Sequence, residues 1–220
     1  MDTKQSPSKK EIKIIVVGNS ATGKTSFVNK WTKNTFNENY KATIVSEFSY
    51  KIYDYKGNQY KIQLWDLAGQ DQNTCVTKIF AKDSHGTIVL SDITNEQTLH
   101  ECIKWKNSVD DTTKFIDGDF LPSVLVRNKI DLIEGDITDD AEIKEFADKN
   151  KFVNVFKTSA KMGIGINECM DFLIGVIVDR LEKCTKEGKV PQDKPRPNLV
   201  LQSSKAAKNT EDSKTGGGCC

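Results

Sequence analysis

A glycine-rich segment near the start of the chain has the spacing of a phosphate-binding loop. Residues 18–25 read Gly-Asn-Ser-Ala-Thr-Gly-Lys-Thr and match the pattern GxxxxGK[ST], after an apolar run and before a helical pattern. Glycines let the backbone turn its amides toward phosphate oxygens, and the start of the following helix adds partial positive charge. We therefore predict that this segment binds the phosphates of a nucleotide, through Gly18, Asn19, Ser20, Ala21, Thr22, Gly23, Lys24, Thr25 and Ser26.

Two side chains of this loop can act directly on phosphate and metal. Lys24 can reach the β- and γ-phosphates, where its charge would assist catalysis, and Thr25 can ligate Mg²⁺ through its hydroxyl. The alternative is a glycine-rich turn with an incidental lysine, but the strand–loop–helix context favours a nucleotide site.

The segment Asp66-Leu67-Ala68-Gly69-Gln70 follows another strand-like run and contains residue types that phosphoryl transfer requires. An acid at a strand end, here Asp66, can hold Mg²⁺ directly or through water. Gly69 lets a backbone amide approach a γ-phosphate, and Gln70 can orient an attacking water. Taken alone, the segment could equally be an ordinary turn.

Asn128-Lys129-Ile130-Asp131 follows a further apolar run and indicates which base is bound. The Asp131 carboxylate can accept hydrogen bonds from the N1–H and 2-amino groups of guanine, and adenine lacks both donors on that edge. Sites of this kind reject the wrong ligand by about 10⁴–10⁵. Asn128 and Lys129 would fix the loop and pack against the base. The backbone amides of Ser159, Ala160 and Lys161 could bind the guanine O6.

These segments need a scaffold that brings several strand ends together. Patterning predicts strands over 12–17, 47–53, 59–67, 87–91, 123–127 and 152–156, and helices over 24–33, 97–109, 139–150 and 166–182. Strands and helices alternate apart from one hairpin. We therefore predict an α/β P-loop NTPase fold, with a six-stranded, mostly parallel sheet, one antiparallel edge strand and about five helices on both faces. Ligands of such sheets bind beyond the carboxyl ends of the strands, where the motifs lie.

Composition excludes several classes. The chain has 220 residues and a net charge of +1, so no overall basic field favours nucleic acid as a partner. It has no apolar run of the ~20 residues that span a bilayer, so we expect no transmembrane helix. Its first residues have no apolar signal core, so we expect no secretion and therefore cysteines in the reduced form. We predict a flexible leader over 1–10, a globular domain over 11–182, and a disordered basic tail over 183–220.

In this order, the motifs resemble those of the Ras-like small GTPases, specifically the Rab family, over residues 11–182 and at the cysteine terminus. The resemblance implies a GTP-hydrolysing switch that regulates vesicle trafficking, with Mg²⁺ as cofactor. It implies that Thr43 joins Thr25 and a water-linked Asp66 in binding the metal, and that Gln70 is the catalytic glutamine. Phe36 resembles the aromatic residue that packs on the base.

The resemblance also implies protein partners: exchange factor, activating protein, dissociation inhibitor, prenylation machinery and effectors. Phe48, Trp65 and Phe80 match the aromatic triad that Rab effectors contact, although such residues can also be ordinary core. No arginine stands in the phosphate loop or near Thr43. We therefore expect slow hydrolysis by a monomer, until an activating protein supplies an arginine worth about 10³–10⁵ in rate.

The chain departs from the Rab pattern around both switches. Val45 replaces a glycine, Asp71-Gln72-Asn73 replaces Glu-Arg-Phe, and Leu67 replaces a threonine. Leu67, the Lys104-Trp105-Lys106 segment and the longer 117–122 segment are similar to a Rab subgroup linked to phagosomes and lysosome-related organelles. The altered switches leave open a nucleotide-locked membrane scaffold without turnover. A P-loop kinase or ATPase is a further alternative, but it leaves Asp131 unexplained.

Cys219 and Cys220 end the chain and match the terminus that many Rabs have geranylgeranylated. Two lipid chains give stable membrane attachment, whereas one binds weakly, and basic residues before them attract anionic lipid. Inert thiols are the alternative. We expect a lipid-anchored protein that divides between cytosol and the cytoplasmic face of an endosomal, phagosomal or lysosome-related membrane.

Overall fold

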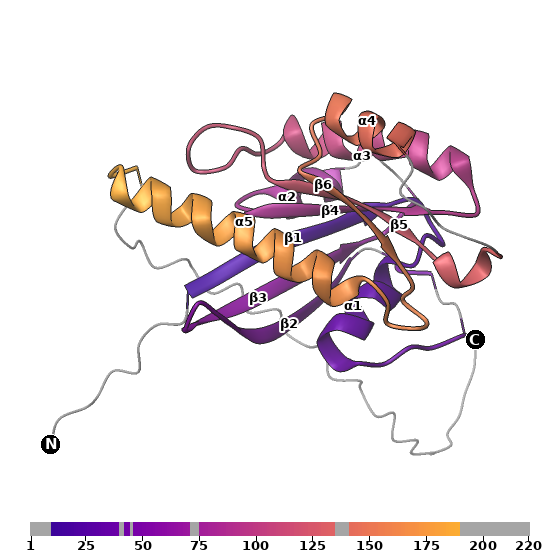
Figure 1. The fold of residues 1–220 in the computed structure, drawn as a ribbon. Helices are drawn as coiled ribbons and strands as arrows, with labels where there is room; N and C mark the ends of the chain where they lie inside the picture. The colour runs from indigo at the N-terminus through magenta and orange to yellow at the C-terminus, as the bar shows by residue number, and fades with distance from the viewer. Residues whose placement is uncertain (1–9, 40–41, 45, 71–74, 135–140, 190–220) are drawn as a thin grey trace, which may run out of the picture. The chain divides into compact units, whose positions relative to one another are not determined.

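The strands form a six-stranded sheet in the order β2-β3-β1-β4-β5-β6 (Figure 1). The structure is a computed structural model, and it describes residues 10–39, 42–44, 46–70, 75–134 and 141–189. Only β2 runs antiparallel to its neighbour, and the other pairs are parallel. This confirms the predicted α/β fold. The strands are β1 Lys10–Gly18, β2 Ser46–Tyr55, β3 Asn58–Leu67, β4 Gly86–Asp92, β5 Ser123–Asn128 and β6 Asn154–Thr158.

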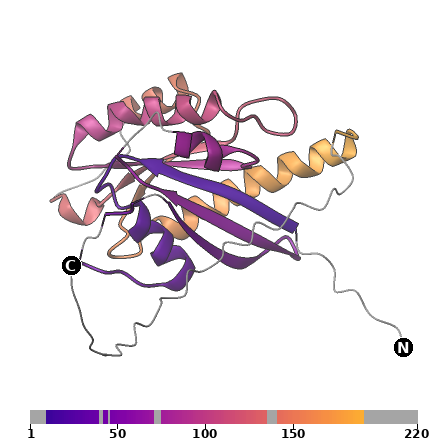
Figure 2. The same cartoon turned by 180° about the vertical axis from the view of Figure 1, so that it is seen from behind.

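Helices cover both faces of the sheet. They are α1 Lys24–Lys33, α2 Cys75–Ala81, α3 Glu96–Asp110, α4 Ala141–Lys149 and α5 Ile166–Lys186, with a short 3₁₀ helix at Ile130–Leu132. Helices α1 and α5 contact each other on one face, and α2 and α3 contact each other on the opposite face. In Figure 1 helix α5 crosses in front of the sheet, and in Figure 2 the sheet lies in front of α5.

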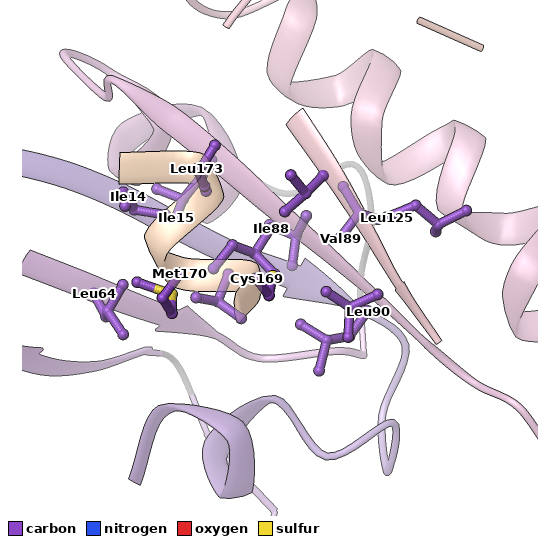
Figure 3. Close-up of a cluster of buried hydrophobic side chains, with 14 of the residues drawn as sticks. Ile14, Ile15, Leu64, Ile88, Val89, Leu90, Leu125, Cys169, Met170 and Leu173 are labelled. Atoms are coloured by element: carbon purple, nitrogen blue, oxygen red, sulfur yellow. The ribbon is translucent and has the colours of Figure 1, made fainter. Parts of the chain in front are cut away.

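Buried side chains pack on both faces of the sheet, and one part of the core lies between α5 and the central strands. Ile14, Ile88 and Leu125 are wholly buried, as expected of inner parallel strands that are covered on both faces. Figure 3 shows Ile14 near Leu173 of α5 and Ile88 near Cys169 of the same helix, whereas Leu125 lies away from α5. Burial of each large aliphatic side chain stabilises the fold by about 1.5–3 kcal/mol. This core fixes the strands whose ends carry the motifs.

At two predicted element boundaries tertiary contacts account for the difference, and one helix was not predicted. The sixth strand begins at Asn154, not at residue 152, because Phe152 belongs to the turn after α4: its amide donates to the Ala147 carbonyl (2.9 Å) and its ring is buried. The last helix continues past Glu182 to Lys186, since Cys184 is buried and Lys183 and Lys186 lie in its last turn, where cations are favourable. Helix α2 was not predicted, because seven residues are too short for a periodic pattern.

Several sequence features lie outside the described residues: positions 1–9 of the leader, Val45, Asp71-Gln72-Asn73, and Cys219 with Cys220. Of the predicted tail, the structure describes only positions 183–189. Within the described ranges, no helix is both long enough and apolar enough to cross a bilayer.

Candidate nucleotide and magnesium site

A cavity of about 910 Å³ opens where the predicted motifs meet. The parallel strands end at one edge of the sheet, with Gly18 paired to Leu90, and Asn128 paired to both Asp92 and Thr158. Of the predicted nucleotide-binding residues, those that line the cavity are Ser20, Ala21, Gly23, Lys24, Thr25, Ser26, Phe36, Thr43, Gly69, Asn128, Lys129, Asp131, Ala160 and Lys161. Gly18, Asn19, Thr22 and Ser159 do not line it but support residues that do.

The glycines at both ends of the phosphate loop are required by its geometry. Gly18 and Gly23 have φ angles of 140° and 92°, which L-residues rarely adopt. A Cβ at Gly18 would lie 2.3 Å from the Leu90 carbonyl oxygen, and a Cβ at Gly23 would lie 2.4 Å from Nδ2 of Asn128. The loop can therefore pass so close to β4 and β5 only with glycine at these positions.

Lys24 is held inside this loop. Its Nζ donates to the carbonyl oxygens of Gly18 and Asn19, each at 2.8 Å, and its side chain is buried. Burial lowers the pKa of the ammonium to about 8, while the charge of Asp66 acts in the opposite direction. An anion in the cavity would stabilise the charged form, so the site favours a phosphate ligand.

Oxygen atoms gather beside Lys24 and fit a magnesium ion. The Thr25 hydroxyl donates to Oδ2 of Asp66 (2.5 Å) and lies 3.0 Å from the Thr43 hydroxyl. Asp66 is fully buried, and within the described residues its Oδ1 has no hydrogen-bond partner. Burial raises the pKa of this carboxyl to about 6. A metal with a preference for oxygen ligands would satisfy the unpartnered atom and favour the ionised form.

Asn128 connects the phosphate loop to both segments predicted to bind the base. Its Nδ2 donates to the Thr22 carbonyl (2.9 Å), and its Oδ1 accepts from the Thr158 hydroxyl (3.0 Å) and the Ala160 amide (3.1 Å). One buried amide therefore fixes the phosphate loop, the end of β5 and the end of β6 relative to one another.

The predicted guanine-binding carboxylate is also oriented by its neighbours. Asp131 accepts from the Ser159 hydroxyl (2.5 Å), which accepts in turn from the Met162 amide (2.9 Å). Lys129 has a left-handed backbone (φ 70°) and pairs with Asp92 (2.6 Å). Burial alone would raise the pKa of Asp92, but hydrogen bonds from Lys129 and Thr94 lower it overall.

Gly69 lies directly against the phosphate loop. Its carbonyl accepts from the Ser20 amide (3.0 Å), and a Cβ at this position would lie 2.3 Å from that nitrogen. Gln70, which follows, is exposed and does not line the cavity. The structure thus brings Gly69 to the site but not the predicted catalytic glutamine.

The three aromatic residues predicted to face effectors form one cluster outside the cavity. The ring of Trp65 lies 5.0 Å from that of Phe48 and 5.2 Å from that of Phe80. Trp65 and Phe80 are half-buried against the core, whereas Phe48 is 45% exposed. Part of the cluster is therefore available at the surface.

Sequence reasoning missed several residues that line the cavity or contact its lining. The cavity is also lined by Asn29, Lys33, Thr35, Asn37, Glu38, Asn39, Ala42, Glu47 and Leu132. Asp92 was missed as well, although its place at the end of β4, like that of Asn128 at the end of β5, was a usable signal.

Comparisons with known proteins agree with this geometry. Residues 13–179 match the Ras family. The chain is 34% identical over 168 residues to "Ras-related protein Rab-32C" of Dictyostelium discoideum, covering 76% of this chain and 74% of the relative. It is 33% identical over 163 residues to human "Ras-related protein Rab-7L1" (74% and 80%) and 31% identical over 167 residues to human "Ras-related protein Rab-32" (76% and 74%).

These matches support GTP binding and hydrolysis, and they give no support to a nucleotide-locked scaffold. They also agree with the subgroup resemblance, since Rab-32 proteins recur among the relatives. The chain belongs to the Rab small GTPases of the Ras family and is related to the Rab-32 group.

Proposed function

We propose that this GTPase binds GTP and GDP with Mg²⁺ in the cavity at the carboxyl ends of the strands, and that the exchange of one for the other controls vesicle traffic. One observation carries the proposal: a buried lysine, an oxygen cluster and an oriented carboxylate line or border the same cavity. Each matches one part of guanosine triphosphate, namely its phosphates, its metal and its base.

Hydrolysis proceeds by attack of water on the γ-phosphate. Lys24 and the amides of the phosphate loop stabilise the charge that develops on the phosphate oxygens. When bound, Mg²⁺ supplies further positive charge there, held by Thr25, Thr43 and, through water, Asp66. Gln70 orients the water, which requires it to move from its exposed position toward the cavity.

The guanine base is selected at the opposite end of the cavity. Asp131 accepts hydrogen bonds from its N1–H and 2-amino groups, and the Lys161 amide binds its O6, since the Ala160 amide donates to Oδ1 of Asn128. Phe36 and Lys129 flank the ring, and both side chains line the cavity. Adenine would leave the Asp131 carboxylate desolvated and unpaired, so ATP is rejected.

Thr43 makes the site a switch, because its contact with the metal depends on the γ-phosphate. Loss of that phosphate releases the segment around Thr43 and changes the surface that partners contact. Effectors bind at Phe48, Trp65 and Phe80. No arginine is found among the described residues that line the cavity, so an activating protein supplies one and raises the rate. An exchange factor and a dissociation inhibitor complete the cycle.

Membrane attachment depends on the end of the chain. Geranylgeranyl groups on Cys219 and Cys220, added by the prenylation machinery, anchor the protein to the cytoplasmic face of an endosomal, phagosomal or lysosome-related membrane. The dissociation inhibitor returns it to the cytosol.

Single-turnover hydrolysis of bound GTP tests the proposal, with wild-type protein beside Gln70→Leu. Leucine cannot orient water, so we expect slow hydrolysis in the wild type and a loss of at least about tenfold in the variant. Absence of hydrolysis in both proteins, despite tight GTP binding, would contradict turnover and restore the locked scaffold. Preference for ATP in competition would contradict the role of Asp131.

A further inference from the structure

One side chain of the phosphate loop points away from the cavity and into α3. Oδ1 of Asn19 accepts a hydrogen bond from the indole Nε1–H of Trp105 (2.8 Å). Nδ2 of the same amide donates to the carboxylate of Glu101. Both partners lie on α3, one turn apart, so the helix contacts both ends of the Asn19 amide.

The two partners define the orientation of this amide. Trp105 is wholly buried, so its N–H must find an acceptor within the protein. Nδ2 of Asn19 donates to the Glu101 carboxylate, and this bond and one from Gln97 lower the pKa of Glu101, so that it accepts in its ionised form. Asparagine offers an acceptor and a donor in one side chain, which aspartate at this position could not do.

The backbone of Asn19 supports the groups that face the phosphates. Its carbonyl oxygen accepts from Nζ of Lys24 (2.8 Å) and from the Thr22 hydroxyl (2.9 Å). The following amide, Ser20 N–H, donates to the carbonyl of Gly69 (3.0 Å). A Cβ on Gly69 would lie only 2.4 Å from the carbonyl carbon of Asn19, so these backbones are in close contact.

We propose that Asn19 is a positioning residue, and that Trp105 and Glu101 of α3 hold it so that Lys24 and Gly69 keep the geometry that binds the phosphates. The inference rests on the proposed nucleotide site and adds two residues that lie outside the cavity lining. Because small displacements of positioned groups weaken binding and catalysis strongly, loss of the hydrogen bonds from Asn19 to Trp105 and Glu101 accelerates nucleotide release.

Release of a fluorescent GDP analogue from the full chain with Mg²⁺ tests this inference. Asn19→Ala removes both side-chain hydrogen bonds, and we expect release to become about tenfold faster or more. Asn19→Asp keeps an acceptor for Trp105 but places two carboxylates together, so release also accelerates by about tenfold. Glu101→Gln in the Asn19→Asp background restores a donor–acceptor pair and returns release to within about threefold of the wild type.

Tyr53→Phe is the matched control. It removes the hydrogen bond that the Tyr53 hydroxyl on β2 donates to Asp171 on α5. Neither residue lines the cavity. We expect it to leave release unchanged, and thermal unfolding of all variants separates stability from nucleotide kinetics.

Wild-type release rates in Asn19→Ala, whether or not its melting temperature falls, would overturn the inference while leaving the proposed function intact. Failure of Glu101→Gln to rescue Asn19→Asp would overturn the role of Glu101. Failure of the wild-type chain to bind the GDP analogue would instead overturn the proposed function, and the inference with it.

Discussion

The base end of the cavity, around Asn128, differs from the phosphate end, around Lys24 and Asp66, in how its polar groups are satisfied. Asn128 and Asp131 are bound by groups of the protein itself. At the phosphate end, burial lowers the pKa of Lys24 and raises that of Asp66, and one oxygen of Asp66 has no partner in the described part of the chain. The base end is thus preorganised, whereas the phosphate end depends on its ligands to become electrostatically stable.

Gly23→Ala should have the largest effect, because this residue lies directly against Asn128, where the two ends meet. Alanine at this position would have to adopt an unfavourable φ of 92°. Its Cβ would also collide with Nδ2 of Asn128, which binds the phosphate loop to the base-binding segments. We expect GDP affinity to fall by roughly a hundredfold or more, measured by titration.

Gly57→Ala provides the matched control. Gly57 also has positive φ (74°), but no atom lies within 4 Å of its added Cβ. The control should cost about 1 kcal/mol of unfolding free energy and leave GDP affinity unchanged. Equal loss of affinity in both variants would show that strain, not the contact with Asn128, is responsible.

Asp131→Asn tests the preorganised end. Its side chain would present an amide donor where guanine requires an acceptor, so GDP affinity should fall by about a hundredfold or more. Xanthosine diphosphate, which carries a carbonyl in place of the 2-amino group, should bind better to the variant than to the wild type. Competition between the two nucleotides measures this exchange, and an unchanged preference would contradict base recognition by Asp131.

The same contrast explains which parts of the site could be predicted from the sequence. Gly18–Thr25 and Asn128–Asp131 were predictable because their chemistry depends on neighbours in the sequence. The contacts of Asn19 with Trp105 and of Lys129 with Asp92 join distant residues, so local patterns could not indicate them.

The fold itself was predictable because alternating strands and helices are local patterns with few possible arrangements. Boundaries failed where tertiary contacts override local patterns. Phe152 is apolar and continues the pattern that predicts a strand, yet it is buried in the turn that follows α4. Cys184 sits in a polar stretch, yet its burial extends α5 beyond the point where the apolar pattern ends.

A pH dependence should distinguish the phosphate end. The pKa of Asp66 is about 6 in the folded protein, above the ordinary value of 3.8. Between these values the folded state binds a proton that the unfolded state does not, so stability through this group rises as pH falls from 7 to 5. Without metal or nucleotide, we expect the wild type to gain roughly 1 kcal/mol over this range relative to Asp66→Asn, measured by urea unfolding in EDTA.

With metal bound, low pH should weaken the site instead of stabilising the protein. A proton on Asp66 competes with Mg²⁺, so Mg²⁺-dependent retention of GDP should weaken as pH falls below about 6 in the wild type. In Asp66→Asn, retention should depend little on Mg²⁺ at any pH. Strong retention by Mg²⁺ in this variant would contradict the assignment of Asp66 to the metal.

The smallest effect is expected at the mouth of the cavity, where Lys161 pairs with Glu38 at 3.2 Å. This pair also joins the base end to the segment before Thr43, but its side chains are 51% and 75% exposed. Exposed ion pairs contribute about 0–1 kcal/mol, because water screens them and ordering the side chains costs entropy. Glu38→Gln should therefore change GDP release by less than about fivefold, with the difference disappearing at high salt. A larger effect that persists in salt would mean that the Lys161–Glu38 pair helps to retain the nucleotide. The buried hydrogen bonds of the base end would then not account for retention alone.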